Sequence, residues 1–363
     1  MERLRIFADC HVFDGTLQGS STYLKGLYSE LIKDKNKLFF LAACDTANLE
    51  TIFGTHENVI YLAYPSKNKF KRLLFDIPKL ITQHQIDFAH FQYIVPPIKK
   101  CKYIVTTHDV LFMDFPQYFP LTYRIKNKLL FKASARYSDV VLTVSDYSKQ
   151  QIQRHFGIKK ITITPNAVDP IFFETYEKAA VIEQVKNKFD VSNYWLFVSR
   201  WEPRKNHDRL LKVFVEGEFY KHSDLVFIGD PAIPNPAYDA FYESLDVAIK
   251  QKIKVLNKVS FQDMVLLVRG ASLSVYPSIA EGFGIPPLES LGANVTTICS
   301  NTTAMSDFDF LGECLFNPLD EMDLLQKAKY ALANPDVSTT SAIVEKKYHW
   351  SVAAAQFNKA ICE

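Results

Sequence analysis

Short apolar runs alternate with segments of helical spacing along the chain, and this alternation constrains the fold more than any other feature. In the first half the predicted strands are residues 4–8, 38–42, 59–62, 87–91, 103–106 and 140–144. Helical patterns separate most of them. Strands that helices cover on both faces are buried on both sides, so they read as continuous apolar runs. The first half is therefore predicted to be an α/β domain with a parallel sheet.

The same pattern restarts after residues 165–170, a Pro-Asn-Ala-Val-Asp-Pro segment that is typical of a hinge or linker. The second series of predicted strands is 194–198, 225–229, 252–256, 273–276 and 295–299. A chain of 363 residues is long enough for two domains of ordinary size. We expect Rossmann-like domains at 1–170 and 171–349, facing each other across a cleft, and a C-terminal helix at 350–363. Such domains bind ligands at the carboxyl ends of their strands.

The composition favours a soluble globular protein and gives no sign of a cysteine-based metal site. Hydrophobic residues make up 48% and charged residues 23%, the balance of a soluble globular protein. The six cysteines lack the paired spacing of a metal site, which favours a reduced, cytoplasmic protein. Residues 1–170 carry a net charge of +8 and residues 171–363 a net charge of −6. This asymmetry indicates either that the first domain meets an anionic partner or that surface charge simply varies along the chain.

Residues 276–290 read Tyr-Pro-Ser-Ile-Ala-Glu-Gly-Phe-Gly-Ile-Pro-Pro-Leu-Glu-Ser and form the most informative segment. A predicted strand ends, a glycine loop follows, and a proline suits the first turn of a helix. Gly282 and Gly284 let backbone approach a ligand closely, and the helix N-terminus attracts an anion. Glu281 in the loop and Glu289, expected in the first turn of the helix, offer carboxylates to sugar or ribose hydroxyls.

A basic turn follows another predicted strand. Residues 197–207 read Phe-Val-Ser-Arg-Trp-Glu-Pro-Arg-Lys-Asn-His, which places Arg200 and Lys205 just beyond the end of that strand. Fixed cations in this position suit a pyrophosphate, through charge and through directed N–H bonds.

Together the two segments resemble the signature of glycosyltransferase family 4, whose members are retaining enzymes of the GT-B fold. Further landmarks occur in the order of the family: Thr107-His108-Asp109, Thr143-Val144-Ser145, Pro165-Asn166-Ala167-Val168-Asp169 and Trp350-Ser351. In this fold the helix that begins at Trp350 crosses back to the first domain. The chain departs from the family at Ala167, where a glycine is usual, and at 292–295 and 304–307. These changes flank the donor pocket and bear on the identity of the donor sugar.

The resemblance implies a role for each matching residue. In the second domain, Arg200 and Lys205 would bind the donor diphosphate and stabilise the leaving phosphate. Glu289 would hold the ribose, and the base would lie near Val259. The donor sugar would be held by Glu281, Gly282, Phe283 and Gly284. In the first domain, Gly19 would approach the phosphates and His108 the sugar. The implied catalytic set is His108, Arg200, Lys205 and Glu281, without a protein nucleophile.

The implied reaction transfers a hexose-type sugar from a nucleotide diphosphate sugar to a glycan or lipid-linked acceptor in surface polysaccharide synthesis. The Glu-Pro-Arg-Lys-Asn run is similar to mannosyltransferases that use GDP sugars, although a UDP sugar stays open as the co-substrate. No cofactor, metal or nucleic acid is expected. Asp307 and Asp309 have the spacing of a GT-A metal motif, but they follow a complete donor signature, so we interpret them as a turn.

Three alternatives use the same architecture. A catalytically inactive relative that binds a nucleotide sugar would be expected to lose Arg200, Lys205 or Glu281. A GT-B sugar-nucleotide epimerase or phosphorylase would not need the glutamate pair and the basic turn together. An oxidoreductase should show a tight G-x-G-x-x-G loop, and Gly15 and Gly19 do not fit that spacing.

Two basic segments of the first domain, 67–80 and 124–136, are interleaved with apolar residues. Phe70, Leu73, Leu74 and Ile77 have the spacing of one helical face, with lysines and Arg72 around it. One hypothesis is a helix whose apolar face packs in the core while its basic face is solvated. The other is peripheral contact with an anionic membrane, at the inner face of the cell membrane.

Overall fold

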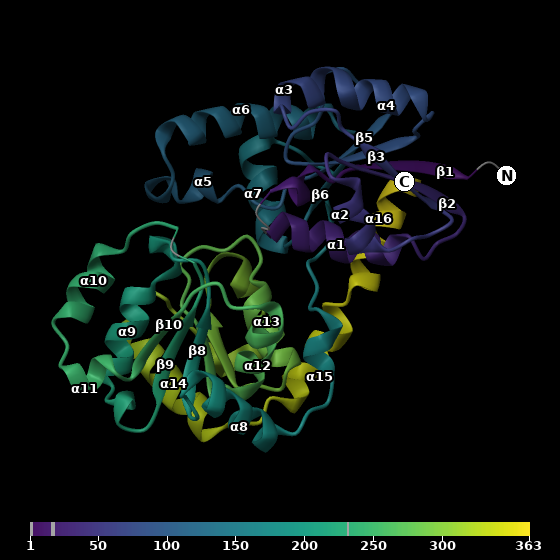
Figure 1. The fold of residues 1–363 in the computed structure, drawn as a ribbon. Coiled ribbons are helices and arrows are strands. Elements are labelled where there is room, and N and C mark those ends of the chain that lie inside the picture. The colour runs from purple at the N-terminus through teal and green to yellow at the C-terminus, as the bar shows by residue number, and fades with distance from the viewer. Residues whose placement is uncertain (1–2, 16–18, 231) are drawn as a thin grey trace. The chain divides into compact units, whose positions relative to one another are not determined.

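The computed structural model describes residues 3–15, 19–230 and 232–363. The chain divides into two compact units, one ending at Ala167 but including His349–Glu363, and the other comprising Val168–Tyr348. The expected boundaries were residues 170 and 350. Each unit is a parallel sheet with helices on both of its faces (Figure 1).

The sheet of the first unit has seven strands in the order β3-β2-β1-β4-β5-β6-β7, all parallel. Its strands are β1 (Leu4–Asp9), β2 (Lys37–Ala43), β3 (Val59–Ala63), β4 (Phe88–Gln92), β5 (Lys102–Thr106), β6 (Val140–Thr143) and β7 (Thr162–Ile163). The helices are α1 (Gly19–Leu31), α2 (Thr46–Phe53), α3 (Lys69–Lys71), α4 (Ile77–Gln83), α5 (Leu111–Asp114), α6 (Leu121–Tyr137), α7 (Asp146–Phe156) and α16 (Trp350–Cys362). Shorter turns are the 3₁₀ helices η1 (His11–Asp14) and η3 (Pro116–Tyr118) and the π-helix η2 (Arg72–Asp76).

The sheet of the second unit has six parallel strands in the order β10-β9-β8-β11-β12-β13. These are β8 (Tyr194–Val198), β9 (Asp224–Ile228), β10 (Ile253–Leu256), β11 (Leu273–Tyr276), β12 (Thr297–Ser300) and β13 (Leu315–Phe316). Its helices are α8 (Lys178–Phe189), α9 (His207–Glu216), α10 (Pro236–Glu243), α11 (Val247–Lys250), α12 (Phe261–Gly270), α13 (Ile285–Gly292), α14 (Glu321–Ala333) and α15 (Ser338–Lys347). The 3₁₀ helices are η4 (Pro170–Phe173), η5 (Pro203–Lys205), η6 (Phe219–Lys221), η7 (Thr303–Asp307) and η8 (Asp309–Cys314).

The apolar runs in the middle of each sheet became strands that are buried on both faces, as a parallel sheet under helices requires, whereas β3 at the edge of the first sheet is only partly buried. β4 and β11 are buried at every position. The C-terminal helix α16 packs against α1 and so belongs to the first unit. The Trp350 ring lies directly on Gly26, and any Cβ at that position would collide with it. The absence of a side chain at Gly26, in the middle of α1, therefore allows α16 to pack closely against α1.

The helix predicted over residues 67–80 differs from expectation. Leu73 and Ile77 are buried, but Phe70 and Leu74 are exposed, so the four do not share one buried face. A π-helix at Arg72–Asp76 interrupts the segment, and its wider turn rotates the residues that follow relative to an α-helical register. Among the residues that the structure describes, no helix has the length and apolar character that a membrane crossing demands.

Candidate active site

The second sheet reverses its strand order between β8 and β11, which pair with each other. From β8 the chain proceeds outward to β9 and β10, and from β11 it proceeds the other way to β12 and β13. At such a switch point the loops beyond the carboxyl ends of the two strands diverge and leave room for a ligand. The basic turn follows β8 and the glycine loop follows β11, so both sequence motifs lie at this point.

Backbone and side-chain hydrogen bonds join the two loops. The N–H of Ile279 donates to the carbonyl of Arg204 at 2.8 Å. Asn206 has a left-handed backbone, with a φ of 66°, and its buried amide donates to the carbonyls of Pro277 and Pro318 at 3.0 and 2.8 Å. The basic turn is therefore held against the glycine loop before any ligand arrives.

An ion cluster lies where the loops meet. Lys205 and Glu281 form a direct ion pair, and each side chain is only 15% exposed. The guanidinium of Arg204 donates to the other oxygen of Glu281 at 3.2 Å and to the carbonyl of Ala280 at 2.6 Å. Arg204 also pairs with Glu202 at 2.8 Å. Glu281 thus fixes the positions of two cations at the edge of the sheet.

The electrostatics of the cluster favour the ionised form of Glu281. Burial alone raises the pKa of this carboxyl, but the charges of Lys205 and Arg204 outweigh it and hold the pKa at about 2. Burial lowers the pKa of Lys205, against the opposing attraction of Glu281. The carboxylate therefore stays charged throughout the physiological range of pH.

The structure brings Lys205 and Glu281 together, but it places Arg200 differently. The side chain of Arg200 is 62% exposed and approaches Glu202 only to 4.0 Å. Arg204 and Glu202 were not among the predicted site residues, although both belong to the basic turn. The only signal for Arg204 and Glu202 in the sequence is that they lie next to predicted site residues. The sequence does not reveal which of the three neighbouring cations, Arg200, Arg204 and Lys205, contact Glu281.

The glycine loop is shaped by packing beneath it. Gly284 has a φ of +103°, and a Cβ there would lie 3.0 Å from Met305. The ring of Phe283 is buried edge-on against Phe308 and Tyr348, at 6.0 and 5.8 Å between centroids. Little of the Phe283 side chain is therefore accessible from outside. Gly282 lies between Phe283 and Glu281 and is half-buried.

Glu289 lies in the second turn of α13 rather than the first, because the helix already begins at Ile285. Its side chain is half-buried. Burial, and then the charge of Asp169, raise the pKa of Glu289 to about 7. Near neutral pH this carboxyl is poised between its two protonation states, the opposite of Glu281.

In the first unit, His108 follows β5 and is buried. Its Nε2–H donates to Oε1 of Gln92 at 2.6 Å. The rings of Tyr23 and Tyr93 pack against the imidazole, with 5.0 and 5.3 Å between ring centroids. Burial lowers its pKa to about 4, so the imidazole is neutral at pH 7. Gln92, at the end of β4, was not predicted from the sequence.

Two other predicted positions lie in loops or at helix ends. Gly19 is the exposed first residue of α1, and residues 16–18 before it lie outside the described part of the chain. Val259 is half-buried in the loop between β10 and α12. Within the described ranges, no group of three or more His, Cys, Asp or Glu side chains could hold a metal ion, and Asp307 and Asp309 fall in short 3₁₀ turns.

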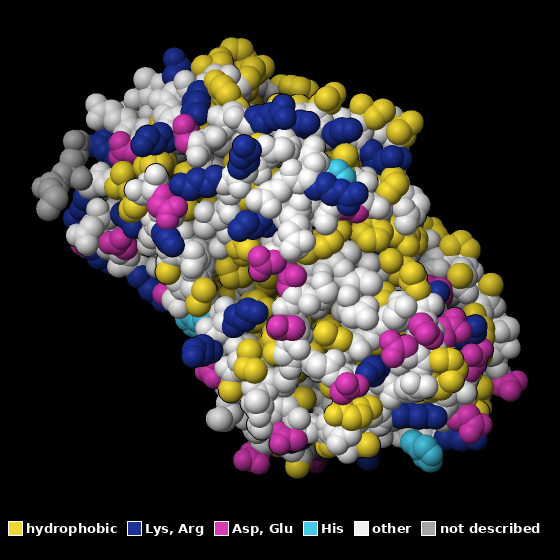
Figure 2. Space-filling model, turned by 180° about the vertical axis from the view of Figure 1, so that it is seen from behind, with side chains coloured by type: hydrophobic (Ala, Val, Ile, Leu, Met, Phe, Trp, Pro, Cys, Tyr) yellow, Lys and Arg dark blue, Asp and Glu magenta, His cyan; other side chains and the backbone are white. Residues whose placement is uncertain are grey.

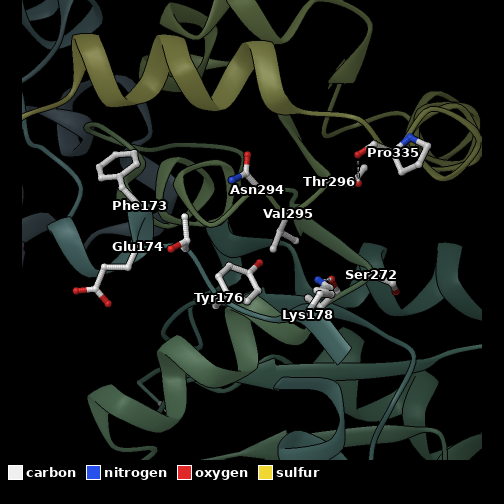
Figure 3. Close-up of a pocket in the computed structure, with 11 residues that line it drawn as sticks. Phe173, Glu174, Tyr176, Lys178, Ser272, Asn294, Val295, Thr296 and Pro335 are labelled. Atoms are coloured by element: carbon white, nitrogen blue, oxygen red, sulfur yellow. Dashed lines mark hydrogen bonds between the residues drawn. The ribbon is translucent and has the colours of Figure 1, made fainter. Parts of the chain in front are cut away.

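A separate pocket of about 500 Å³ lies at the opposite, amino edge of the second sheet, where Ser272 and Thr296 precede β11 and β12 (Figure 3). Several of its polar side chains bond to the protein itself, such as the Tyr176 hydroxyl, which donates to the carbonyl of Ala293 at 2.5 Å. Lys178 donates to the carbonyls of Arg269 and Ala271 at 2.6 and 2.8 Å. This pocket lacks the convergent charges of the carboxyl edge and is distinct from the cluster around Glu281.

Comparison with known proteins places this geometry in context. A family model described as Glycosyltransferase Family 4 matches residues 17–172, and one described as Glycosyl transferases group 1 matches residues 179–350. The O-antigen chain mannosyltransferase RfbU of Salmonella typhimurium is 29% identical over 237 residues, which cover 64% of this chain and 61% of that protein. The chain thus matches less than two thirds of that relative's length.

Solved structures show the same fold. Sucrose-phosphate synthase from Thermosynechococcus elongatus has a TM-score of 0.74 at 15% identity, covering 98% of each chain. HepE from Anabaena, solved in complex with UDP, has a TM-score of 0.72 at 15% identity and covers 99% of each chain. The predicted α/β fold of two Rossmann-like domains, the GT-B fold, is confirmed. Because the Glycosyltransferase Family 4 model matches the first half and the Glycosyl transferases group 1 model matches the second, the chain belongs to glycosyltransferase family 4.

Proposed function

We propose that this chain transfers a hexose-type sugar, mannose-like and carried by GDP, to a glycan or lipid-linked acceptor in surface polysaccharide synthesis. The observation that carries the proposal is the pairing of Lys205 and Arg204 with Glu281 at the switch point of the second sheet. The similarity to an O-antigen chain mannosyltransferase supports the choice of sugar and setting. The UDP complex of HepE supports a nucleoside diphosphate as the ligand of this fold.

The cluster suits a leaving diphosphate. Lys205 is held in place by Glu281, so it needs no reorganisation when charge develops on the phosphate. Arg200 is exposed on the same loop and can turn its guanidinium onto the diphosphate, which accepts two parallel N–H bonds. In this proposal the main role of Glu281 is to position Lys205. Its carboxylate oxygens would also accept hydrogen bonds from the donor sugar with the lone pairs that Lys205 and Arg204 do not use.

Glu289 would bind the ribose hydroxyls of the donor. Its raised pKa follows from burial beside Asp169, and two hydroxyl donors would favour the ionised form. Donor binding should therefore release a proton from Glu289 near neutral pH. Backbone of Gly282, Phe283 and Gly284 would contact the sugar. In the first unit, the Nδ1 of His108 would accept a hydrogen bond from a sugar hydroxyl, because Nε2 already donates to Gln92.

The mechanism we propose is retaining and independent of divalent metal. The lysine and arginine side chains would neutralise the charge of the diphosphate, so no metal ion would be needed for this. The nucleotide sugar is the co-substrate, and no other cofactor takes part.

A thermal-shift titration tests the donor site. The melting temperature should be measured without nucleotide, with GDP and with UDP. Each nucleotide is used at about 100 times its dissociation constant, since a ligand in that excess stabilises its target by about 2.7 kcal/mol. We expect GDP to raise the melting temperature of the wild type, and not that of Lys205→Ala. The matched control is Lys186→Ala, an exposed lysine on α8 that should respond as the wild type does. Radiolabel from GDP-mannose should then appear in lipid-extractable or polymeric product.

The proposal fails if neither nucleotide shifts the wild type, or if Lys205→Ala responds like the control. A shift with UDP alone would overturn the choice of GDP while leaving the site in place.

A further inference from the structure

The outer side of α6 carries an apolar stripe that nothing in the first unit covers among the described residues. Leu121, Ile125 and Leu129 are 62%, 54% and 65% exposed, and their spacing of four residues places them along one side of the helix. The opposite side of the helix is buried through Asn127, Phe131, Ser134 and Ala135. The helix therefore packs on the unit through one side and presents an apolar stripe to solvent on the other.

A second apolar strip lies beside it. Phe70 and Phe75, on the turns from α3 through η2, are 76% and 66% exposed. α3 lies beside α6 (Figure 1), and Lys69 on α3 is close enough to Lys126 on α6 to feel its charge. Figure 1 shows α3, α4 and α6 along one edge of the first unit, and Figure 2 shows hydrophobic side chains gathered there with lysines and arginines beside them.

The exposed charged side chains of α6 and of residues 67–80 are all basic. Residues 121–137 contain five lysines and arginines and no aspartate or glutamate. In residues 67–80 the single acidic side chain, Asp76, is buried. Arg72 is buried as well, with its Nε 3.6 Å from Asp9, so it stabilises the interior and is not part of the surface. The exposed cations are lysines such as Lys71, Lys126 and Lys128.

We propose that this basic–apolar face, made by Phe70, Phe75, Leu121, Ile125 and Leu129 with the lysines around them, docks on an anionic lipid bilayer. Exposed aromatic and aliphatic side chains partition into the interface while lysines meet the lipid phosphates. A second copy of the chain is a poor occupant, because a symmetric contact would set five cations against five. Nucleic acid is equally poor, because its phosphates would meet the apolar stripe.

The face adjoins the residues of the first unit that carry site chemistry. α6 is a crossover between parallel strands, so its first turn lies at the carboxyl edge of the sheet. On its inner side, Phe131 stacks on Tyr93 at 4.6 Å, and Tyr93 packs against His108. If the proposed function holds, docking would bring this edge to a lipid-linked acceptor. The lipid binding itself does not depend on catalysis.

Vesicle co-sedimentation tests the proposal without any donor or acceptor. The wild type should sediment with vesicles of equal parts phosphatidylglycerol and phosphatidylcholine, should stay in the supernatant with phosphatidylcholine alone, and should be released by salt. Lys126→Glu/Lys128→Glu should bind at least about 25-fold more weakly, since each basic residue near such a surface contributes about fivefold. Ile125→Ser/Leu129→Ser should also bind the anionic vesicles more weakly than the wild type, and should be released at a lower salt concentration, because it keeps the charges and removes the apolar contribution.

The matched control is Lys186→Glu/Lys329→Glu, which makes the same charge change at exposed sites of the second unit and should bind within about twofold of the wild type. All substituted positions are exposed, and an unchanged melting temperature verifies folding. Leu129→Trp supplies a direct reporter, because Trp195, Trp201 and Trp350 are buried. Its emission should shift to the blue on anionic vesicles.

Three results would overturn the proposal. The wild type could stay in the supernatant with anionic vesicles at low salt. The control variant could lose as much binding as Lys126→Glu/Lys128→Glu, which would indicate only a general charge effect. Self-association in the absence of vesicles, abolished by Ile125→Ser/Leu129→Ser, would assign the face to a second copy of the chain. A failed donor-site test would leave the vesicle result unaffected.

Discussion

Replacing Glu281 by glutamine should destabilise the second unit as well as reduce transfer. The sequence predicted a carboxylate that faces a ligand, and the structure shows in addition that it pairs with Lys205 and Arg204. Glutamine keeps the shape of the side chain and removes its charge. Two partly buried cations would then lose their shared counter-ion, which is costly because charges in a low-dielectric site need a partner.

The magnitude follows from the pKa. A fall from the ordinary value of 4.5 to about 2 corresponds to about 3 kcal/mol of unfolding free energy at pH 7. We therefore expect Glu281→Gln, which mimics the uncharged carboxyl, to cost about 3 kcal/mol at pH 7. Because the folded pKa is depressed, the stabilisation is complete above pH 4.5 and is lost as the pH falls through about 2.

Denaturant unfolding followed by tryptophan fluorescence measures this difference, since Trp195 and Trp201 both lie in the second unit. The gap between wild type and Glu281→Gln should narrow as the pH falls from 5 towards 2. Glu313→Gln is the control, because Glu313 is 70% exposed and water screens its pair with the half-buried Lys327, so its removal should cost far less than that of Glu281. Equal stability of wild type and Glu281→Gln at pH 7, or a gap that does not depend on pH, would refute the reasoning.

Further predictions concern the other site residues. Lys205→Ala should lower kcat/KM for transfer by about 100-fold, and Arg200→Lys by about tenfold, because an ammonium lacks the guanidinium fork; steady-state kinetics with a fixed acceptor would measure both. Wild-type affinity for the nucleotide should rise from pH 6 to 8 as Glu289 ionises, and calorimetry on Glu289→Gln should show weaker binding without this trend. At pH 8 Glu289→Gln should also melt higher than wild type, since ionising the buried carboxyl opposes folding. Transfer should survive excess EDTA, and loss that manganese or magnesium restores would contradict the proposed metal independence.

Most strands and the family could be predicted from the sequence because each depends on local pattern. The run at 194–198 is β8 and the run at 273–276 is β11, with the same bounds as expected. β13 was missed because two residues, Leu315–Phe316, carry no recognisable periodicity. The surface at 67–80 could not be predicted either, since a π-turn at Arg72–Asp76 shifts the helical register without a distinct signal in composition.

The sequence by itself determined two α/β units and the two loops that carry the candidate site, because apolar periodicity and glycine or proline punctuation act over a few neighbouring residues. Which charges meet was decided only by the tertiary structure. Arg204 and Glu281 are 77 residues apart and come together because β8 and β11 are neighbours in the sheet. Likewise, the opposite pKa shifts of Glu281 and Glu289 arise from the surroundings that folding gives each carboxyl: two cations lower the pKa of Glu281, whereas burial and then the charge of Asp169 raise the pKa of Glu289.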